Sequence, residues 1–194
     1  GPEAPTLAPG LLKPSQTVPL QGISKTIADH MRGSIAGTAQ LSFFLELDVT
    51  DAQRLRREAS GGDGATISLA HVLIKACAET LKRHPEHNTV LSDGNVLYFD
   101  EINIGFAVAL SEGLIVPVLK QVNGKSVQEI AGEMDKLADK ARDGKLSTDD
   151  VSGGTFTISV LGSVDGFTPI LNARQDAILG VGRSVEKPVV RKGE

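Results

Sequence analysis

The stretch of residues 102–120, INIGFAVALSEGLIVPVLK, decides the fold class. Its first part, residues 102–110, is nearly all apolar from Ile104 onward, which predicts a β-strand covered on both faces. A turn signal follows, and residues 114–120 predict a second strand. Pro117 in that second strand has no amide hydrogen to donate. We therefore expect the second strand to lie at a sheet edge or to carry a bulge.

Helices are predicted on both sides of this strand pair. Apolar residues recur with helical spacing in each, and Thr50 with Gln53 and Ser126 with Glu129 have the spacing of capping boxes. Pro85 ends the helix with the longest apolar stripe. The predicted helices cover residues 23–37, 50–61, 68–84 and 126–143, and glycines stop the first, second and last of them near residues 37, 61 and 144.

Other segments alternate with period two. Residues 41–47 place apolar side chains on one face, with Phe44 as an exception, and predict a half-buried strand. Further short strands are predicted over residues 96–99, 155–161 and 177–182. The order of helices and strands is mixed, so we expect an α/β or α+β domain with a largely antiparallel or mixed sheet.

Composition bounds the class of protein. The chain has 194 residues with a formal net charge of -4, and it lacks the basic excess typical of nucleic-acid-binding proteins. The longest apolar runs are far shorter than a membrane span. Residues 1–17 hold four of the nine prolines and predict a flexible linker or tag remnant, with the folded core over residues 18–194. One cysteine permits no internal disulfide, which favours a cytoplasmic location.

The hydroxyl residues near position 157 are the most informative polar pattern. Period two places Thr155, Thr157 and Ser159 on one face of a strand. Such a face borders either solvent, which is the commoner case, or a polar channel. In a channel, a hydroxyl at the strand end can donate to the oxyanion of an acyl-transfer reaction.

The other reactive side chains favour ordinary structural roles. Cys77 lies on the apolar stripe of its helix, which predicts a buried, inert thiol. His84 and His87 flank a helix-breaking proline, and no carboxylate or cysteine cluster completes a metal site around them. His71 points off the apolar stripe, so we expect it to be exposed. His30 can face either solvent or a cleft. We predict no metal site.

Several ordered motifs carry a resemblance to a known family. Residues 18–190 resemble the catalytic core of dihydrolipoyl acyltransferases, the acyl-transferring component of 2-oxo acid dehydrogenase complexes. The matching stretches are KTIA (25–28) with Met31, TAQL (38–41), ELDVT (46–50), NIGFAV (103–108), GLIVPV (113–118), ARDGKL (141–146), GGTFTIS (153–159), FTPI (167–170) and AILGVG (177–182).

The resemblance implies a fold and an assembly. The family has the chloramphenicol-acetyltransferase-like two-layer sandwich of helices on a mixed sheet. It forms homotrimers, often assembled into larger cages, with active sites in channels between neighbouring subunits. Coenzyme A or acyl-CoA is a substrate, a lipoyl group on a lipoyl domain is the acceptor, and no metal takes part.

The resemblance also implies roles for individual residues. Ser159 matches the serine whose hydroxyl stabilises the tetrahedral oxyanion. Phe167 and Leu179 match apolar residues of the channel in which coenzyme A and the acyl acceptor meet, and Lys25 matches a basic residue near its coenzyme A end. In the family, a histidine is the general base that deprotonates the acceptor thiol.

This sequence departs from the family pattern in several places. The family histidine lies in a C-terminal Asp-His-Arg-x-x-Asp-Gly motif that these 194 residues do not contain, so we expect the core to be C-terminally incomplete or to lack that base. Ser24 and His30 replace family arginines, and Ala109 replaces a common aspartate. The loop over residues 162–167 is about two residues shorter than usual by this resemblance.

Three functional hypotheses follow. The first is transfer of an acyl group, with acetyl the first candidate, to a dihydrolipoyl thiol. The second is transfer to the hydroxyl of a small molecule by a stand-alone enzyme. The third is a non-catalytic scaffold that has lost the base. If the chain as given is active, His30 on the first helix is the candidate for a substitute base, because imidazole titrates near neutral pH. Otherwise His30 is a surface replacement for arginine.

Overall fold

The computed structural model describes residues 15–60, 66–111 and 113–190. Its central sheet has the strand order β6-β3-β7-β8. These strands are β3 (Ile104–Phe106), β6 (Val118–Leu119), β7 (Phe156–Val160) and β8 (Ile178–Val181). β3 pairs antiparallel with β6 and parallel with β7, and β7 pairs parallel with β8. The sheet is therefore mixed, as predicted.

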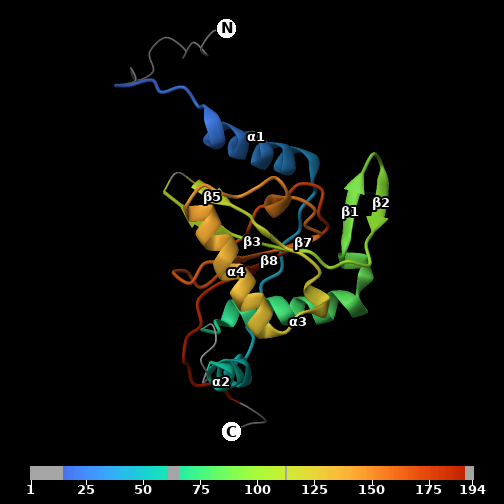
Figure 1. Cartoon of the computed structure of the whole chain (residues 1–194), viewed down its shortest axis with the longest axis vertical. Coiled ribbons are helices and arrows are strands. Elements are labelled where there is room, and N and C mark those ends of the chain that lie inside the picture. The colour runs from blue at the N-terminus through green and yellow to red at the C-terminus, as the bar shows by residue number, and fades with distance from the viewer. Residues whose placement is uncertain (1–14, 61–65, 112, 191–194) are drawn as a thin grey trace.

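Two helices form the second layer. α3 (Leu69–Arg83) and α4 (Val127–Arg142) share one apolar core with the sheet, and Figure 1 shows α4 crossing in front of the strands. The fully buried centre of this core includes Ile74 from α3, Ile130 from α4, and Ile104 and Ile158 from the sheet. The predicted two-layer sandwich is confirmed.

The strand predicted over residues 102–110 is divided in two. β3 is buried throughout and belongs to the central sheet, whereas β4 (Val108–Leu110) pairs with β5 (Gly113–Ile115) in a separate hairpin. The amide of Ala107, between β3 and β4, donates to the carbonyl of Ile158 at 3.2 Å. Periodicity cannot reveal such a break, because the apolar run is continuous across it.

The strand predicted over residues 114–120 is divided into β5 and β6, which belong to different sheets, and Pro117 is part of neither. It lies between β5 and β6, and β6 is an edge strand of the central sheet. Its carbonyl accepts from the amide of Phe106 at 3.0 Å, and Pro117 itself is buried. The missing proline donor therefore falls where no ladder bond is interrupted.

The helix starts agree with prediction in part. α4 has the predicted capping box between Ser126 and Glu129. α2 (Thr50–Ala59) does not use Thr50 and Gln53, because the helix begins at Thr50 itself and the side chain of Asp48 accepts from the Thr50 amide at 2.9 Å. The predicted N-cap is therefore one position too late, and the N-cap residue, Val49, makes no side-chain capping hydrogen bond. The glycines predicted to stop α2 lie outside the described residues.

Helix α1 (Gly22–Gly37) is also confirmed, but the segment after it is not a strand. Residues 38–49 have no regular structure in the described chain. The apolar side chains of the predicted strand are exposed, with Phe43 at 82% and Leu45 at 84%. The prediction of a half-buried strand is wrong for the single chain, because the segment pairs with no strand and these side chains stay exposed. We call residues 38–49 the exposed segment.

A hairpin also stands away from the body. β1 (Thr89–Ser92) pairs with β2 (Asn95–Tyr98), and Figure 1 shows the pair at one side of the molecule. The short helix η1 (Pro85–His87) leads into it, and two other short helices, η2 (Val122–Gly124) and η3 (Asp149–Val151), flank α4. Leu91, Val96 and Tyr98 on the hairpin are exposed.

Residues 1–14 of the predicted tail lie outside the described residues. None of the described helices combines the length and apolar character that a membrane crossing requires.

Candidate active site

Ser159 lies where the central sheet ends. It is the fourth residue of β7, half-buried, and its register partner in the neighbouring strand β8 is Gly180. No hydrogen bond within the described chain involves its hydroxyl group. The hydroxyl of Ser159 is thus available to a ligand near the C-terminal end of the inner strand β7.

Phe167 and Leu179 lie close to Ser159. Leu179 precedes Gly180 in β8 and pairs with Ile158 of β7. The loop that carries Phe167 rests directly on Gly180, since a Cβ atom at that glycine would lie 3.0 Å from the ring of Pro169 and 3.4 Å from the Phe167 carbonyl. The structure therefore brings the backbone of the Phe167 loop close to that of Ser159 at Gly180. The side chain of Leu179 shares the opposite face with Ile158 and packs against the apolar core.

A second glycine, Gly182, contacts the start of the same loop directly after the end of β8. A Cβ atom on Gly182 would lie only 2.1 Å from the carbonyl oxygen of Asp165, so no larger residue fits there without moving the backbone. The amide of Arg183 donates to the Val164 carbonyl at 2.8 Å, and its guanidinium pairs with Asp165 at 2.6 Å. The start of the loop is held tightly against β8.

The other hydroxyls on this face of β7 are not exposed. Thr155 and Thr157 are buried, and Thr157 is only 2% exposed. Thr157 donates to the side chain of Gln175 at 2.7 Å, and Thr155 donates to the side chain of Asn88 at 2.6 Å. The commoner expectation of a solvent-facing strand is therefore wrong for these two residues.

Gln175 and Asn88 were not predicted from the sequence. Gln175 also donates to the Gly154 carbonyl at 2.9 Å, and Asn88 donates to the carbonyls of Phe99 and Glu101 at 2.7 and 3.0 Å. Each amide group thus both donates and accepts hydrogen bonds inside the protein. The only sequence signal was the row of hydroxyls on β7, which needed buried polar partners.

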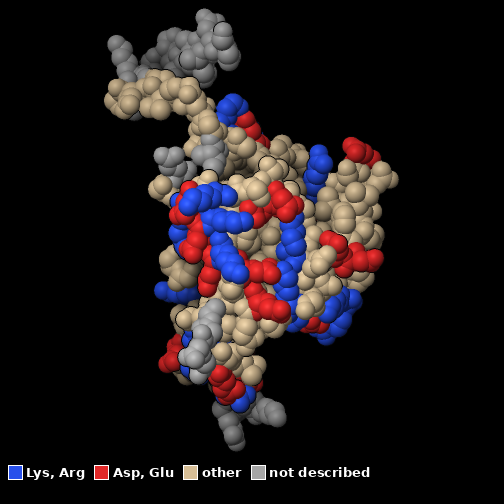
Figure 2. Space-filling model, viewed as in Figure 1, with Lys and Arg blue, Asp and Glu red and all other residues tan. Residues whose placement is uncertain are grey.

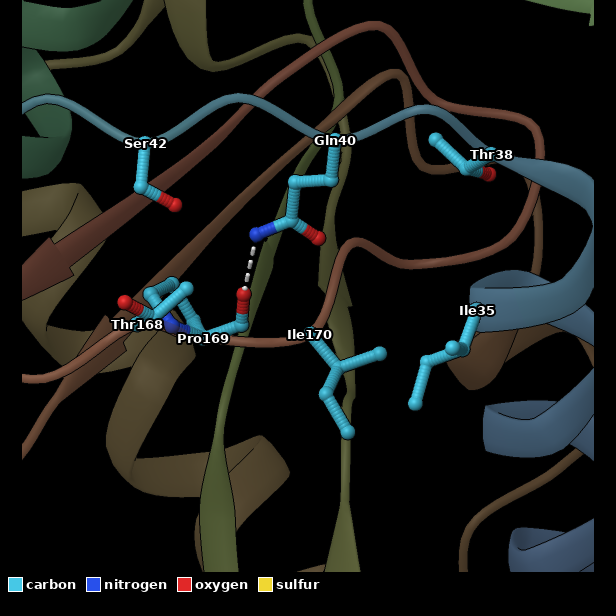
Figure 3. Close-up of a pocket in the computed structure, with 7 residues that line it drawn as sticks. All are labelled: Ile35, Thr38, Gln40, Ser42, Thr168, Pro169 and Ile170. Carbon is cyan, nitrogen blue, oxygen red and sulfur yellow. Dashed lines mark hydrogen bonds between the residues drawn. The ribbon is translucent and has the colours of Figure 1, made fainter.

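The loop is held from its outer side by α1 and the exposed segment. Gln40 donates to the Pro169 carbonyl at 2.8 Å, and Ser34 donates to the Leu171 carbonyl at 2.5 Å. Figure 3 shows Gln40 reaching from the exposed segment to the loop, beside a cavity of about 370 Å³. Its lining is uncharged and comprises Ile35, Thr38, Gln40, Ser42, Thr168, Pro169 and Ile170.

Lys25 and His30 lie on α1, and both are exposed. The ammonium group of Lys25 forms an ion pair with Asp29 one turn later. No hydrogen bond or ion pair in the described part of the chain links either residue to Ser159. The single chain therefore does not bring them to the group around Gly180.

The remaining histidines are engaged elsewhere. His71 is 6% exposed, so the prediction that it is exposed is wrong: its ring accepts from the Ser68 amide at 3.1 Å and completes the capping box of α3. Burial lowers the pKa of His71, against an opposing effect from Asp135. His84 and His87 are exposed beside Glu86 and Asp176, their partners at 3.3 and 2.8 Å.

The Cys77 thiol is half-buried on α3. Burial raises the pKa of Cys77 to about 11, so this thiol stays protonated at neutral pH, as its place on the apolar stripe predicted. Among the residues that the structure describes, no three His, Cys, Asp or Glu side chains gather as a metal site.

Charge on the α4 face is balanced. Figure 2 shows lysine and arginine side chains interleaved with acidic ones over this face. A cavity of about 300 Å³ there is lined by several lysines, among which Lys140 pairs with Asp150 at 3.2 Å and Lys125 pairs with Glu133. This face has no extended basic patch of the kind that binds nucleic acid.

Known proteins resemble the chain in sequence. It is 37% identical over 188 residues to the dihydrolipoyllysine-residue acetyltransferase component of the pyruvate dehydrogenase complex of Staphylococcus epidermidis, covering 93% of this chain and 43% of the relative. It is 33% identical over 186 residues to the corresponding component of the acetoin cleaving system of Bacillus subtilis, covering 93% of this chain and 47% of the relative. The chain thus spans less than half the length of these curated relatives.

Solved structures resemble it equally well. The dihydrolipoamide acetyltransferase of Azotobacter vinelandii matches with a TM-score of 0.89 and 34% identity, over 100% of this chain and 82% of that one. A probable dihydrolipoamide acetyltransferase of Listeria monocytogenes matches with a TM-score of 0.87 and 34% identity, over 92% of this chain and 79% of that one. The family model for the catalytic domain of 2-oxoacid dehydrogenase acyltransferases matches residues 12–194. With sequence, fold and family model in agreement, the chain belongs to the family of 2-oxoacid dehydrogenase acyltransferase catalytic domains.

Proposed function

We propose that the chain is the acyl-transferring core of a 2-oxo acid dehydrogenase complex, moving an acyl group between acyl-CoA and a dihydrolipoyl thiol. The observation that carries this proposal is the Ser159 hydroxyl, which has no partner within the described chain. Its register partner in β8 is Gly180, on which the loop of Phe167 rests. The relatives in Staphylococcus epidermidis and Bacillus subtilis are named as acetyltransferases of a dihydrolipoyllysine residue. These names favour the thiol acceptor over the hydroxyl of a small molecule.

The proposed reaction needs one base and one oxyanion donor. The base takes the proton of the acceptor thiol, and the thiolate attacks the carbonyl carbon of the acyl-CoA thioester. The new carbon–sulfur bond places a negative charge on the carbonyl oxygen, to which Ser159 donates its hydroxyl proton in a hydrogen bond. When the oxyanion collapses, the bond to coenzyme A breaks, and the coenzyme A thiolate recovers the proton from the base.

His30 is the candidate base within this sequence. His71 is buried and uses a ring nitrogen as an acceptor in a helix cap, and His84 and His87 lie beside carboxylates near the β1–β2 hairpin. His30 alone is exposed on α1 without an ion pair in the described chain. Since α1 does not approach Ser159 by any hydrogen bond in one chain, His30 would have to act across a contact with a neighbouring copy.

A test of this assignment is the His30→Ala variant. Loss of acyl transfer with an unchanged melting temperature would support His30 as the base. Activity equal to that of the parent would show that the base lies elsewhere.

Coenzyme A is proposed as a substrate, with no metal. Lys25 on the same helix carries a positive charge suited to a phosphate of coenzyme A, although it forms an ion pair with Asp29 in the free chain. Phe167 is apolar, lies on the loop that rests on Gly180, and would line the path of the pantetheine or lipoyl arm. The resemblance gives Leu179 the same role, but in this chain its side chain packs against the apolar core. A location in the cytoplasm stays a prediction.

We further propose that copies of the chain form homotrimers or a larger cage. A solved relative is the cubic core of a pyruvate dehydrogenase complex, with a TM-score of 0.89. The exposed segment offers the neighbouring copy apolar side chains of Leu41, Phe43, Leu45 and Leu47, each at least 74% exposed. Burial of such residues is the main driving force for protein association. Light scattering that finds only single chains at micromolar concentration would contradict this proposal.

The experiment for the activity is a transfer assay with the full chain. Acetyl-CoA and dihydrolipoamide are mixed with the protein, and release of coenzyme A is followed against a no-acceptor control. Ser159→Ala should lower kcat by about 10²–10³-fold, because it removes an oxyanion donor. Ser184→Ala, at an exposed serine far along the chain, is the matched control and should leave kcat unchanged. A raised KM with unchanged kcat in Ser159→Ala would mean that Ser159 only binds substrate.

The scaffold hypothesis has its own outcome in this assay. A protein that assembles but transfers no acyl group to dihydrolipoamide would be a structural core. Transfer to a small alcohol but not to the thiol would favour the stand-alone enzyme.

A further inference from the structure

The loop of residues 166–171, which carries Phe167, is enclosed between two layers. On its inner side lies β8, where a Cβ atom on Gly180 would meet the ring of Pro169. On its outer side lies the exposed segment, where a Cβ atom on Gly166 would lie 3.5 Å from the ring of Phe44. The loop itself has no regular secondary structure, so its shape depends on these two neighbours.

Gln40 supplies the polar contacts of the outer layer. Its side-chain nitrogen donates to the Pro169 carbonyl at 2.8 Å, and its side-chain oxygen accepts from the Leu171 amide at 3.2 Å. One amide thus bonds the backbone on both sides of Ile170, as a neighbouring strand would. Figure 3 shows the Gln40 side chain extended across to the loop.

Ser34 adds a second anchor at the same place. It lies on α1, is only 4% exposed, and donates to the Leu171 carbonyl. Both backbone groups of Leu171 are therefore bonded to the N-terminal part of the chain, one through Gln40 and one through Ser34. These contacts join residues about 130 positions apart in sequence, as shown by the separation of 131 between Gln40 and Leu171.

We propose that Gln40 is a positioning residue for the acceptor side of the site, since it fixes the loop that presents Phe167. The inference rests on the proposed function, in which Phe167 lines the path of the acceptor. Gln40 touches neither Ser159 nor the reacting atoms. Without its amide, the Pro169 carbonyl and the Leu171 amide turn to water, and the loop samples other shapes. Acceptor affinity then falls in proportion to the fraction of molecules with the ordered loop.

The test compares two glutamine variants of the full chain. Gln40→Met keeps the length of the side chain and removes both hydrogen bonds. Gln128→Met makes the same change at an exposed position on α4, on another part of the molecule, and serves as the control. We expect Gln40→Met to raise the KM for dihydrolipoamide about tenfold if the ordered fraction falls to one tenth. The KM for acetyl-CoA and the melting temperature should stay at parent values.

A second readout does not depend on turnover. Amide hydrogen exchange at Leu171 should be faster in Gln40→Met than in the parent or in Gln128→Met, because its acceptor is gone. If Leu171 exchange is unchanged, or if exchange is faster while the KM for dihydrolipoamide is unchanged, the proposal is overturned. Equal rises in both KM values would also overturn it, because they indicate general loosening of the protein.

The proposed acyl transfer and the positioning role of Gln40 can be tested separately. If the parent transfers no acyl group, that function is wrong, and the dissociation constant for dihydrolipoamide, measured by titration, replaces KM as the readout for Gln40. A weaker dissociation constant in Gln40→Met alone would still support the positioning role. Equal dissociation constants in parent and variant would overturn it.

Discussion

Strand β7 and the exposed segment share one sequence pattern and have opposite surroundings. Both alternate apolar and polar side chains with period two. In β7, Phe156 and Ile158 face the core, while the hydroxyls of Thr155 and Thr157 are bonded to buried amides. In the exposed segment, Phe43 and Leu45 face outward without cover. Alternation with period two therefore indicates an apolar face, but it does not indicate whether that face is buried within the same chain.

The largest expected contrast is in the stability of the single chain. Ile74→Ala removes fully buried atoms from α3 and should lower the free energy of unfolding by about 2–5 kcal/mol. Leu41→Ala in the exposed segment should change it by less than about 0.5 kcal/mol, because the side chain is 75% exposed. Urea unfolding, at concentrations where light scattering finds single chains, measures both. Equal losses of unfolding free energy in the two variants would contradict the difference between the core and the exposed segment.

For assembly, we expect the exposed segment to matter more than the buried core. Phe43→Asp places a charge where we propose that a neighbouring copy docks, and truncation of a buried aromatic anchor costs about 2 kcal/mol or more of binding free energy. Sedimentation should show weaker assembly of this variant, with the melting temperature of the dilute chain unchanged. The control is Ile74→Ala, which should destabilise the chain without specifically weakening the contact. Parent-like assembly of Phe43→Asp would place the interface elsewhere.

A smaller effect is expected at the buried polar face of β7. Thr157→Val keeps the side-chain shape and removes the donor to Gln175, leaving a buried amide oxygen unpaired. Such a loss costs about 1–3 kcal/mol of unfolding free energy. Thr168→Val, at an exposed threonine, is the control and should have little effect. An unfolding midpoint unchanged in Thr157→Val would mean that water satisfies Gln175.

The smallest effect should be a pH dependence from His71. Burial lowers the pKa of His71 in the folded chain, so the unfolded chain binds the proton first as pH falls below about 6.5. Stability is full above that value and declines as pH falls toward the lowered pKa of the folded state. His71→Gln keeps an acceptor for the Ser68 amide and should flatten the decline, measured as unfolding free energy at pH 7.5 and 5.5. An equal decline in both proteins would exclude His71 as its source.

Local signals predicted much of the fold. The capping box at Ser126 and the stop of α3 before Pro85 both follow from the chemistry of one or two neighbouring residues. The division of the strand at Ala107 does not follow from local chemistry, because it depends on β3 pairing with β7 and β4 pairing with β5.

The candidate site was predicted less completely. Ser159, Phe167 and Leu179 came from a resemblance. The structure places the Phe167 loop on Gly180, the register partner of Ser159, but it turns the Leu179 side chain toward the core. Gln40 and Gln175 had no local signal, because each bonds a segment that is distant in sequence. His71 was wrongly placed at the surface, because its ring caps the helix start and folds back into the protein.

The exposed segment has a consequence for how the protein is made. It contains the run Leu41-Ser42-Phe43-Phe44-Leu45, which has no proline and no charge. Runs of this kind promote aggregation when they are left uncovered. If copies of the chain assemble through this segment, as we propose, ordered assembly competes with aggregation in the folded single chain. Glu46 and Asp48, which follow the run, act as gatekeeper charges that favour the ordered outcome.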